Sequence, residues 1–347
     1  MNIHVVQQDE TINSIAENYQ VSVSRLIREN ELDDPDYLVP GQTIVITYPN
    51  RVYTVKEGDS LEIIADKTGV TVLQLLRNNA FLAEREYIYP GESLVVSYEY
   101  KGVLTTFGYT LPFVNSTILR KSLPYLTYLF IYNHRLAISG DVVTFYDDSD
   151  IIKTSREYGT APIMLVTTLT EQGAENVQAA YEILLNENLQ DQLIDNILRI
   201  LDSKGYYGLC MTFLYLTETS QSLYDNFTKK VSRRLSSEGY LVFVTVDPNI
   251  SVISNNLQFP RVDYSVIGSE VNGISILSYV WGTNEKPPSP VSSISNLSEY
   301  LNYVSTMVPS ERITAGLQIL SFNTIFCFSI IVRFALSLIP IGSRTYQ

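Results

Sequence analysis

The chain has 347 residues, more than a single domain usually contains, and a formal net charge of −13. This charge argues against a nucleic acid as partner, because phosphate binding needs clustered lysine and arginine. The cysteines and histidines are too few and too scattered to suggest a metal site, and we expect no cofactor; they are Cys210, Cys327, His4 and His134. The first residues show no basic segment followed by an apolar stretch, so we expect no secretory signal peptide.

Residues 3–46 and 52–96 are two copies of one unit. The run Asp9–Ile12 of the first copy matches Gly58–Leu61 of the second, and a Pro-Gly pair follows at the same place in both. Matched landmarks at a period of about 50 residues indicate a duplicated small domain. Apolar spacing and cap residues predict strand, helix, helix and strand in each copy.

This pattern resembles the LysM module, along the whole length of both copies. The resemblance implies binding of an N-acetylglucosamine polymer, peptidoglycan or chitin, in a groove between the loop after the first strand and the loop after the second helix. Carried over by position, the glycan-binding residues are Gly58, Asp59, Ser60, Leu61, Asn79 and Phe81 in the second copy, and Asp9, Glu10, Thr11, Ile12, Asn30 and Leu32 in the first. A structural alternative makes Asp59 and Ser60 a helix cap and Asn79 a turn residue. The first copy is the weaker candidate, because Asp9 stands where the family has glycine.

From Val103 onward, apolar strand-like segments alternate with amphipathic helices. The strand-like segments are Val103–Tyr109, Tyr125–Ile131, Ala161–Thr167, Gly208–Leu214, Leu241–Val246, Tyr264–Ile267 and Gly273–Tyr279. The helical segments are Gln178–Leu185, Leu189–Lys204 and Ser220–Ser237. Repeated strand–helix units favour a parallel α/β sheet, most simply a TIM barrel.

Four segments carry a second resemblance; they are Leu123–Leu129, Lys204–Leu209, Gly239–Val244 and Ser278–Gly282. They resemble family 18 glycosidases, in the branch that carries LysM modules and acts on spore cortex peptidoglycan. The resemblance runs from about Val103 to Gly316. It implies a strand ending in Asp-x-Asp-x-Glu after a glycine, where the glutamate is the general acid and the preceding aspartate orients the substrate's N-acetyl group.

Aligning Gly208 with the glycine of that motif places Cys210, Thr212 and Leu214 at the three acidic positions. Leucine cannot donate a proton, so we expect the chain not to be an enzyme. The alternative is that Glu218 or Asp247 stands in as the acid. We also expect Asp247, with Tyr279 and Trp281 on either side of Val280, at the mouth of the barrel.

The C-terminal segment Leu317–Ile341 is a long apolar run that departs from the family. We expect it not to form the eighth strand, which would leave Val103–Tyr109 as an exposed edge. Its origin has three readings: a reading-frame change, a substitute strand, or a membrane span, the last disfavoured by Arg333. The expected protein is multidomain, with two βααβ LysM modules and an incomplete α/β TIM-barrel-like domain. The bounds are 1–48 and 51–98 for the modules, 102–316 for the barrel and 317–347 for the tail.

These observations favour a non-catalytic, glycan-binding protein of the spore surface or cell envelope. One alternative is an active N-acetylglucosaminidase of family 18 that acts on cortex peptidoglycan. Another is a structural scaffold of the spore surface. The residues leave open whether the glycan is peptidoglycan or a chitin-like polymer, and a membrane contact would have to come from the apolar tail.

Overall fold

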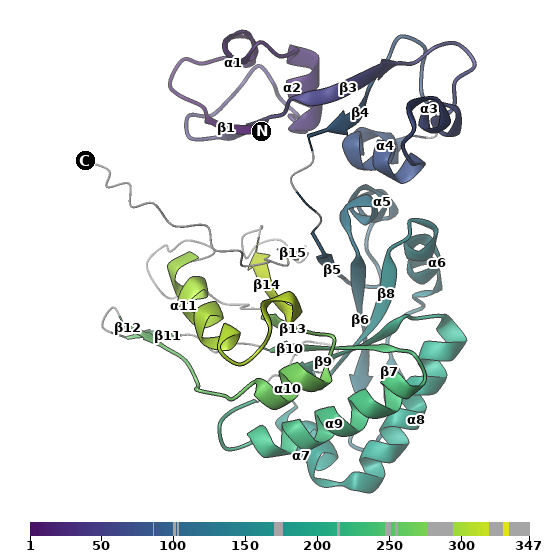
Figure 1. Ribbon diagram of the computed structural model, residues 1–347, viewed down its shortest axis with the longest axis vertical. Helices are drawn as coiled ribbons and strands as arrows, with labels where there is room; N and C mark the ends of the chain where they lie inside the picture. Colours follow the sequence, from purple (N-terminus) through teal and green to yellow (C-terminus); the bar gives the residue numbers. More distant parts are fainter. Residues whose placement is uncertain are drawn as a thin grey trace. The chain divides into compact units, whose positions relative to one another are not determined.

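The computed structural model describes residues 1–85, 87–99, 102, 104–169, 176–213, 216–246, 251–253, 256–276, 294–318 and 329–332. The chain divides into two compact units. The first holds residues 1–102 together with 115–125, and the second holds residues 103–114 and 126–347 (Figure 1). Across the described residues, no helix is long and apolar enough to span a bilayer.

The first unit contains two small domains with the same order of elements, strand, helix, helix and strand. In the first domain these are β1 (Asn2–Val5), α1 (Ile12–Tyr19), α2 (Val23–Glu29) and β2 (Thr43–Ile46). In the second they are β3 (Pro49–Thr54), α3 (Leu61–Thr68), α4 (Val72–Asn78), the 3-10 turn η1 (Ala80–Glu84) and β4 (Ser93–Tyr98). Each pair of strands is antiparallel. The predicted βααβ order is therefore confirmed.

Predicted caps begin the helices of the second domain. The Ser60 hydroxyl accepts a hydrogen bond from the Ile63 amide at 3.3 Å and begins α3. Thr71 forms a capping box with Gln74 and begins α4. The apolar stripes of both helices then face a common core around the fully buried Leu75.

The second unit is a curled sheet of seven successive parallel strands. In spatial order they are β5 (Thr106–Thr110), β6 (Tyr128–Leu136), β8 (Ala161–Thr167), β9 (Gly208–Phe213), β10 (Leu241–Val246), β13 (Gly273–Ile276) and β14 (Ile313–Gln318). A short strand, β7 (Val142–Thr144), pairs antiparallel with β6, and β11 (Ser251–Ile253) forms a separate hairpin with β12 (Asn256–Gln258). The predicted TIM-barrel-like sheet is confirmed.

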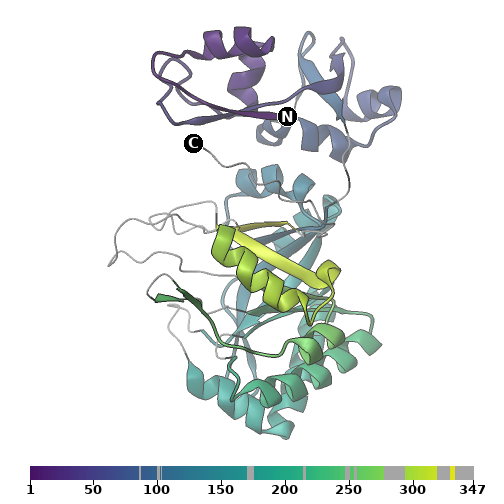
Figure 2. The ribbon, with the colours of Figure 1, turned by 60° about the vertical axis from the view of Figure 1, so that its left-hand side comes forward.

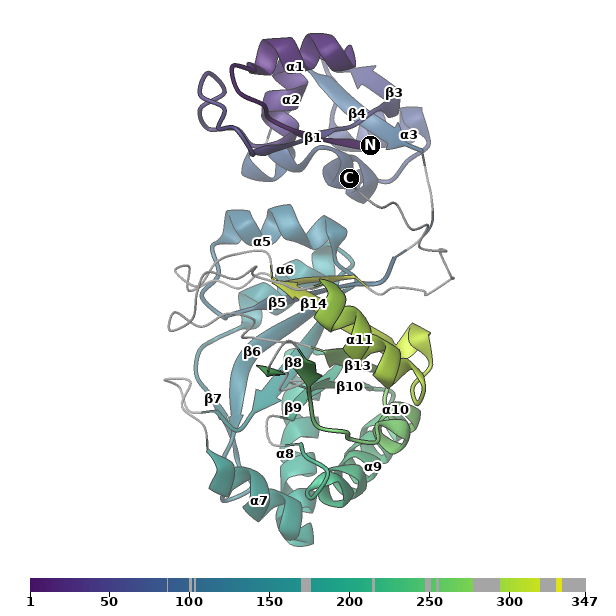
Figure 3. The same cartoon turned by 90° about the vertical axis from the view of Figure 1, so that its left-hand side faces the viewer.

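Helices cover the outside of this sheet (Figures 1 and 3). They are α6 (Ser149–Glu157), α7 (Val177–Leu185), α8 (Glu187–Lys204), α9 (Gln221–Ser237), α10 (Ser265–Glu270) and α11 (Ile294–Ser305), followed by the turn η3 (Ser310–Arg312). Figure 2 shows α11 running beside the yellow strand β14. The helix α5 (Ser116–Ser122) and the turn η2 (Leu123–Tyr125) group with the first unit.

One predicted strand is a helix. The segment Tyr264–Ile267 lies at the start of α10. The Asp263 carboxylate accepts a hydrogen bond from the Ser265 amide at 2.8 Å, which turns the chain into the helix. A short apolar run does not distinguish a buried strand from a buried helical turn, and here the polar residue before it decides.

The expectation of an open edge is also wrong. Residues Ser329–Val332 of the tail form β15, which pairs antiparallel with β14 on one side and with β5 on the other. The substitute-strand reading of the tail therefore fits best. An ordinary eighth strand would be parallel to its neighbours, so β15 closes the sheet in a different way. The rest of the tail, beyond Gln318, lies outside the described residues.

Candidate functional site

In the second repeat, the loop after β3 and the turn that leads into β4 lie at the same end of the sheet. The Val55 amide donates to the Glu92 carbonyl, and the Gly91 amide donates to the Val55 carbonyl, both at 2.8 Å. These bonds place the loop after β3 beside the loop that leads into β4. The sequence assigned the groove to the Gly58–Leu61 loop and the loop after α4 that carries Asn79 and Phe81. Since these bonds lie at the far end of that connection, the groove stays a prediction.

Asp59 fixes the shape of the first loop. Its carboxylate accepts hydrogen bonds from the Tyr53 hydroxyl and the Lys56 amide, both at 2.8 Å, and from the Lys67 ammonium at 2.7 Å. Gly58 precedes it with φ of 80°, a left-handed conformation that glycine adopts without strain. The loop is thus held in one conformation before any ligand arrives.

We expect the Asp59 carboxyl to titrate well below an ordinary aspartate. The hydrogen bonds from Lys67, from the Lys56 amide and from Tyr53 lower its pKa to about 2, against the effect of burial. Because the folded-state pKa is lowered, the stability that Asp59 contributes is present above the unfolded pKa of about 3.9 and is lost as pH falls toward 2. Carbon-detected NMR of the side-chain carboxyl measures this pKa, and a midpoint near 4 would contradict the bonding described here.

Two of the predicted glycan-binding residues, Asn79 and Asn30, use their side chains for hydrogen bonds within their own domains. The Asn79 amide donates to the Leu75 and Val95 carbonyls and its oxygen accepts from the Val95 amide, all at 2.8 Å. Asn30 repeats this arrangement in the first domain. Each asparagine links the end of the second helix to the last strand. This is a larger structural role than that of the turn residue in the structural alternative. Their direct contact with sugar stays a prediction that this geometry does not favour.

The apolar members of the predicted set also serve the cores. Ile12 is buried in the first core, where Leu32 packs against it, and Leu61 packs against the second core. The Phe81 ring is covered by two guanidinium groups, Arg28 at 4.3 Å and Arg85 at 4.8 Å from its centroid. Their apolar surface is therefore largely occupied by the protein itself.

The residues best exposed to a sugar were not predicted. Tyr87 and Tyr89, in the loop before β4, expose 70% and 56% of their surface. Tyr37 and Val39, the matching positions of the first domain, expose 78% and 63%. Large apolar side chains exposed at the same place in both repeats suggest a shared binding role. The signal in the sequence was the tyrosine three positions before the proline of each Pro-Gly pair, Tyr37 and Tyr87.

The first LysM domain builds its loop in the same manner with different residues. Asp9 occupies the position of Gly58 and adopts a φ of 66°. The Glu10 carboxylate accepts from the Gln7 amide and contacts His4 Nε2, both at 2.7 Å, as Asp59 does with its own partners. Thr11 caps α1, as Ser60 caps α3. The repeat therefore preserves the loop although the family glycine is absent.

Inside the barrel of the second unit, aromatic rings pack at the centre, and hydroxyl groups lie toward the carboxyl ends of the strands. Phe107, Phe130 and Phe243 pack at its centre with ring centroids 5.4 to 5.9 Å apart. Toward the carboxyl ends of the strands, the Tyr109 hydroxyl donates to Ser275 Oγ at 2.9 Å and lies 3.2 Å from Thr245 Oγ1. These neutral groups can bond sugar hydroxyls or each other, and none of them is an acid at neutral pH.

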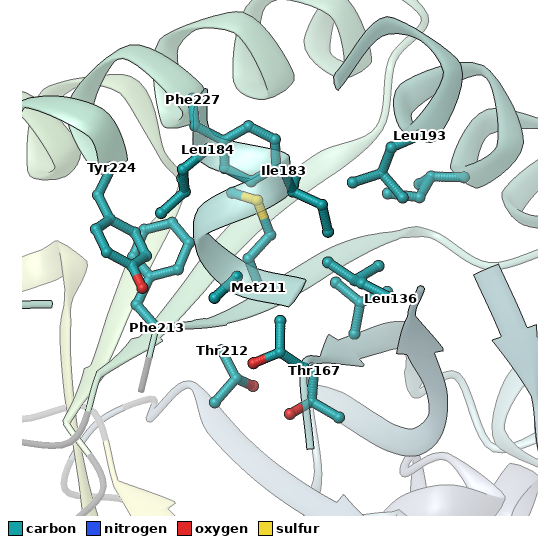
Figure 4. A pocket seen from close by; sticks show the side chains of 14 residues that line it. Leu136, Thr167, Ile183, Leu184, Leu193, Met211, Thr212, Phe213, Tyr224 and Phe227 are labelled. Atoms are coloured by element: carbon teal, nitrogen blue, oxygen red, sulfur yellow. The ribbon is translucent and has the colours of Figure 1, made fainter. Parts of the chain in front are cut away.

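Two of the three positions aligned with the acidic motif, Cys210 and Thr212, are described. Cys210 is fully buried in the barrel, 3.2 Å from Thr245 Oγ1, and burial raises the pKa of its thiol to about 12. The thiol is therefore protonated at neutral pH and is a poor nucleophile. Thr212 follows it two residues later on β9 and lines, with Thr167, the end of a small apolar cavity away from the covering helices (Figure 4). Their match to the family's acidic positions stays a prediction.

The remaining predicted barrel residues, Leu214, Asp247, Tyr279 and Trp281, lie outside the described residues. Glu218 is described, in the turn after β9. Its carboxylate accepts a hydrogen bond from the Arg261 amide at 2.9 Å, so it ties two loops together. The N-cap of α9 is Ser220, and the Thr217 amide donates a hydrogen bond to the Ser220 hydroxyl.

Comparison with known proteins agrees with this geometry. The LysM domain family model matches residues 4–47 and 53–97. The chain carries two LysM domains.

The second unit has a chitinase-like fold. The chain is similar to the crystal structure of the spore cortex-lytic enzyme SleL of Bacillus cereus, with a TM-score of 0.68 and 24% identity over 95% of this chain and 79% of that one. A chitinase of Chromobacterium violaceum matches with a TM-score of 0.55 and 16% identity, over 62% of this chain and 68% of that one.

Two relatives match nearly the whole chain in sequence. YdhD of Bacillus subtilis, by name a sporulation-specific glycosylase, is 27% identical over 332 residues, 94% of this chain and 76% of its own length. The cortical fragment-lytic enzyme of Bacillus anthracis is 25% identical over 327 residues, 92% of this chain and 75% of its own length. The expectation that the chain is not an enzyme is contradicted by these comparisons, because relatives that match more than nine-tenths of the chain are named as enzymes.

Proposed function

We propose that the LysM domains bind a polysaccharide that contains N-acetylglucosamine, with the second domain as the principal site. Two observations carry this proposal: the loop from Gly58 to Leu61, which Asp59 holds in one conformation, and the exposure of Tyr87 and Tyr89 in the connection that leads into β4. A sugar ring packs on an aromatic face, and backbone amides of a fixed loop bond its acetamido group. The fixed loop reduces the entropy lost on binding.

Peptidoglycan is the polymer we propose, and the spore cortex or cell envelope is the proposed location. The names of the relatives support this choice, since two of them refer to the cortex and one to sporulation. Chitin remains a useful probe, because the same sugar forms its repeat.

For the barrel we propose glycosidase activity on the polymer that the LysM domains hold. The similarity to cortex-lytic enzymes over more than nine-tenths of the chain supports it. The described part of β9 supplies a thiol and a hydroxyl and no carboxyl group. We therefore propose that the proton donor comes from another strand end, and Asp247, directly after β10, is the candidate.

The test of binding uses Tyr89→Ala in the full chain. Tyr89 is exposed, so its replacement should leave the fold intact while removing one aromatic contact with the sugar. We expect a loss of about three- to tenfold in affinity for chitopentaose by calorimetry, from a contact of about 0.5–1.5 kcal/mol. Wild-type chain that takes up no chitopentaose and no muropeptide would overturn the proposal. If the variant bound chitopentaose as tightly as the wild-type chain, Tyr89 would not be part of the binding site.

A further inference from the structure

A second hollow lies between the two LysM domains, within the first unit. It has a volume of about 750 Å³, in the range of pockets that bind small ligands. Its walls come from the end of α2, the connection between β2 and β3, the end of α4 and the last residues of β4. The side chains that matter are Arg28, Glu29, Tyr48, Phe81, Tyr98 and Tyr125.

The walls are fixed by contacts between the two domains. The Glu29 carboxylate of the first domain accepts from the Thr47 hydroxyl at 2.7 Å and from the Tyr98 hydroxyl of the second at 3.3 Å. Arg28 of the first domain stacks on the ring of Phe81 in the second. These contacts join α2 to the second domain, so the hollow is preformed and does not depend on a moving loop.

The hollow is lined by aromatic surface that the protein leaves open. Tyr48 is 45% exposed and Tyr125 is 40% exposed. A sugar binds where ring faces contact its C–H groups and charged groups bond its hydroxyls. The walls of the hollow offer both, since carboxylates and guanidinium groups lie between the tyrosines. Arginines and glutamates both line the hollow, which favours an uncharged ligand over a strongly charged one.

We propose that this hollow is a further subsite for the N-acetylglucosamine polymer, in addition to the grooves at the strand ends. The inference rests on the proposed function and deepens it. Phe81 belongs to the wall of the hollow, but Arg28 and Arg85 cover its ring, so the sugar contacts there come from Tyr48 and Tyr125. A chain long enough to occupy both sites would contact both domains. The two LysM domains then act as one receptor for a long glycan, and affinity rises with chain length.

The test compares three variants of the full chain: Tyr48→Ala in the hollow, Tyr89→Ala in the second groove, and Tyr207→Ala as a matched control. Tyr207 is 48% exposed, close to Tyr48, and belongs to the second unit. Calorimetry with chitin oligomers of two to six sugars gives the affinities. We expect Tyr48→Ala to weaken binding of the longest oligomer about three- to tenfold, to affect the disaccharide much less, and to melt within a few degrees of the Tyr207→Ala variant.

A second measurement does not depend on any substitution. In NMR spectra of the wild-type chain, chitohexaose should shift the amides of Tyr48 and Glu99 as well as those of the loop from Gly58 to Leu61. Shifts confined to that loop and to Tyr89, together with equal affinities of Tyr48→Ala and Tyr207→Ala, would overturn the subsite and leave the proposed function standing. Absence of binding by the wild-type chain would overturn both.

Discussion

Replacing Asp148 by alanine is expected to destabilise the barrel by about 3–5 kcal/mol. The carboxylate is completely buried and accepts hydrogen bonds from the Tyr206 hydroxyl at 2.6 Å, from the Asn133 amide at 2.7 Å and from the Lys204 ammonium. His134 Nε2 lies 3.3 Å away. Alanine would leave these donors buried without their acceptor, which costs more than the bonds themselves contribute.

Thermal and urea unfolding of the full chain measure this effect, with Asp150→Ala as the control. Asp150 is an exposed carboxylate two residues away in the first turn of α6, and its loss should cost under about 0.5 kcal/mol. The transition of the second unit should move and that of the first should not. Similar stability of the two variants would show that the buried cluster is not what holds this side of the barrel.

The same cluster predicts acid sensitivity. Burial alone would raise the pKa of Asp148, but the bonds from His134, Lys204, Tyr206 and Asn133 outweigh it and hold that pKa well below its usual range. A lowered folded-state pKa means that the stabilisation is present above the unfolded value of about 3.9 and disappears as pH falls below it. The wild-type barrel should therefore lose more stability than the Asp148→Ala variant on acidification.

Asp247→Asn is expected to lower sugar release from cortex peptidoglycan by at least about a hundredfold. General acid catalysis alone supplies a factor of that size, and an amide cannot donate a proton to the leaving oxygen. In the sequence Asp247 is the residue after β10, and active sites of this fold lie at the carboxyl ends of the strands. The prediction depends on the proposed activity of the barrel.

Glu218→Gln is the matched control for that experiment. Glu218 also follows a barrel strand, but its carboxylate already accepts the Arg261 amide. Glutamine preserves an acceptor, so activity should change less than about threefold. If Glu218→Gln abolished sugar release while Asp247→Asn did not, the assignment of the proton donor would be reversed.

Much of the fold could be predicted because the sequence contains an internal repeat and marks several strands with clear apolar runs. The LysM pair came from the internal repeat, and strands such as Ala161–Thr167 and Leu241–Val246 were found with their bounds unchanged. Gly208 marks a close approach, since a Cβ there would lie 2.2 Å from the Leu241 carbonyl oxygen. At such a position, the type of residue itself indicates the local structure.

Long-range pairing was the part that the sequence did not reveal. The strand β15 is rich in β-branched residues, but the apolar run around it does not mark its ends, and its pairing with β5 and β14 could not be predicted. Likewise, asparagine suits a turn or a sugar equally well, and only the distances of Asn79 to the Leu75 and Val95 carbonyls assign it to the fold. The exposure of Tyr87 and Tyr89 was visible only once the loops were placed.

Co-sedimentation with purified spore cortex peptidoglycan, with released sugars assayed in the same tubes, tests the account most directly. The full chain should move to the pellet, and reducing ends should accumulate in the supernatant. The Tyr89→Ala variant should pellet less, and Asp247→Asn should pellet normally and release almost nothing. A wild-type chain that stays in the supernatant would contradict the LysM assignment of function, and one that pellets without releasing any sugar would contradict the proposed enzyme.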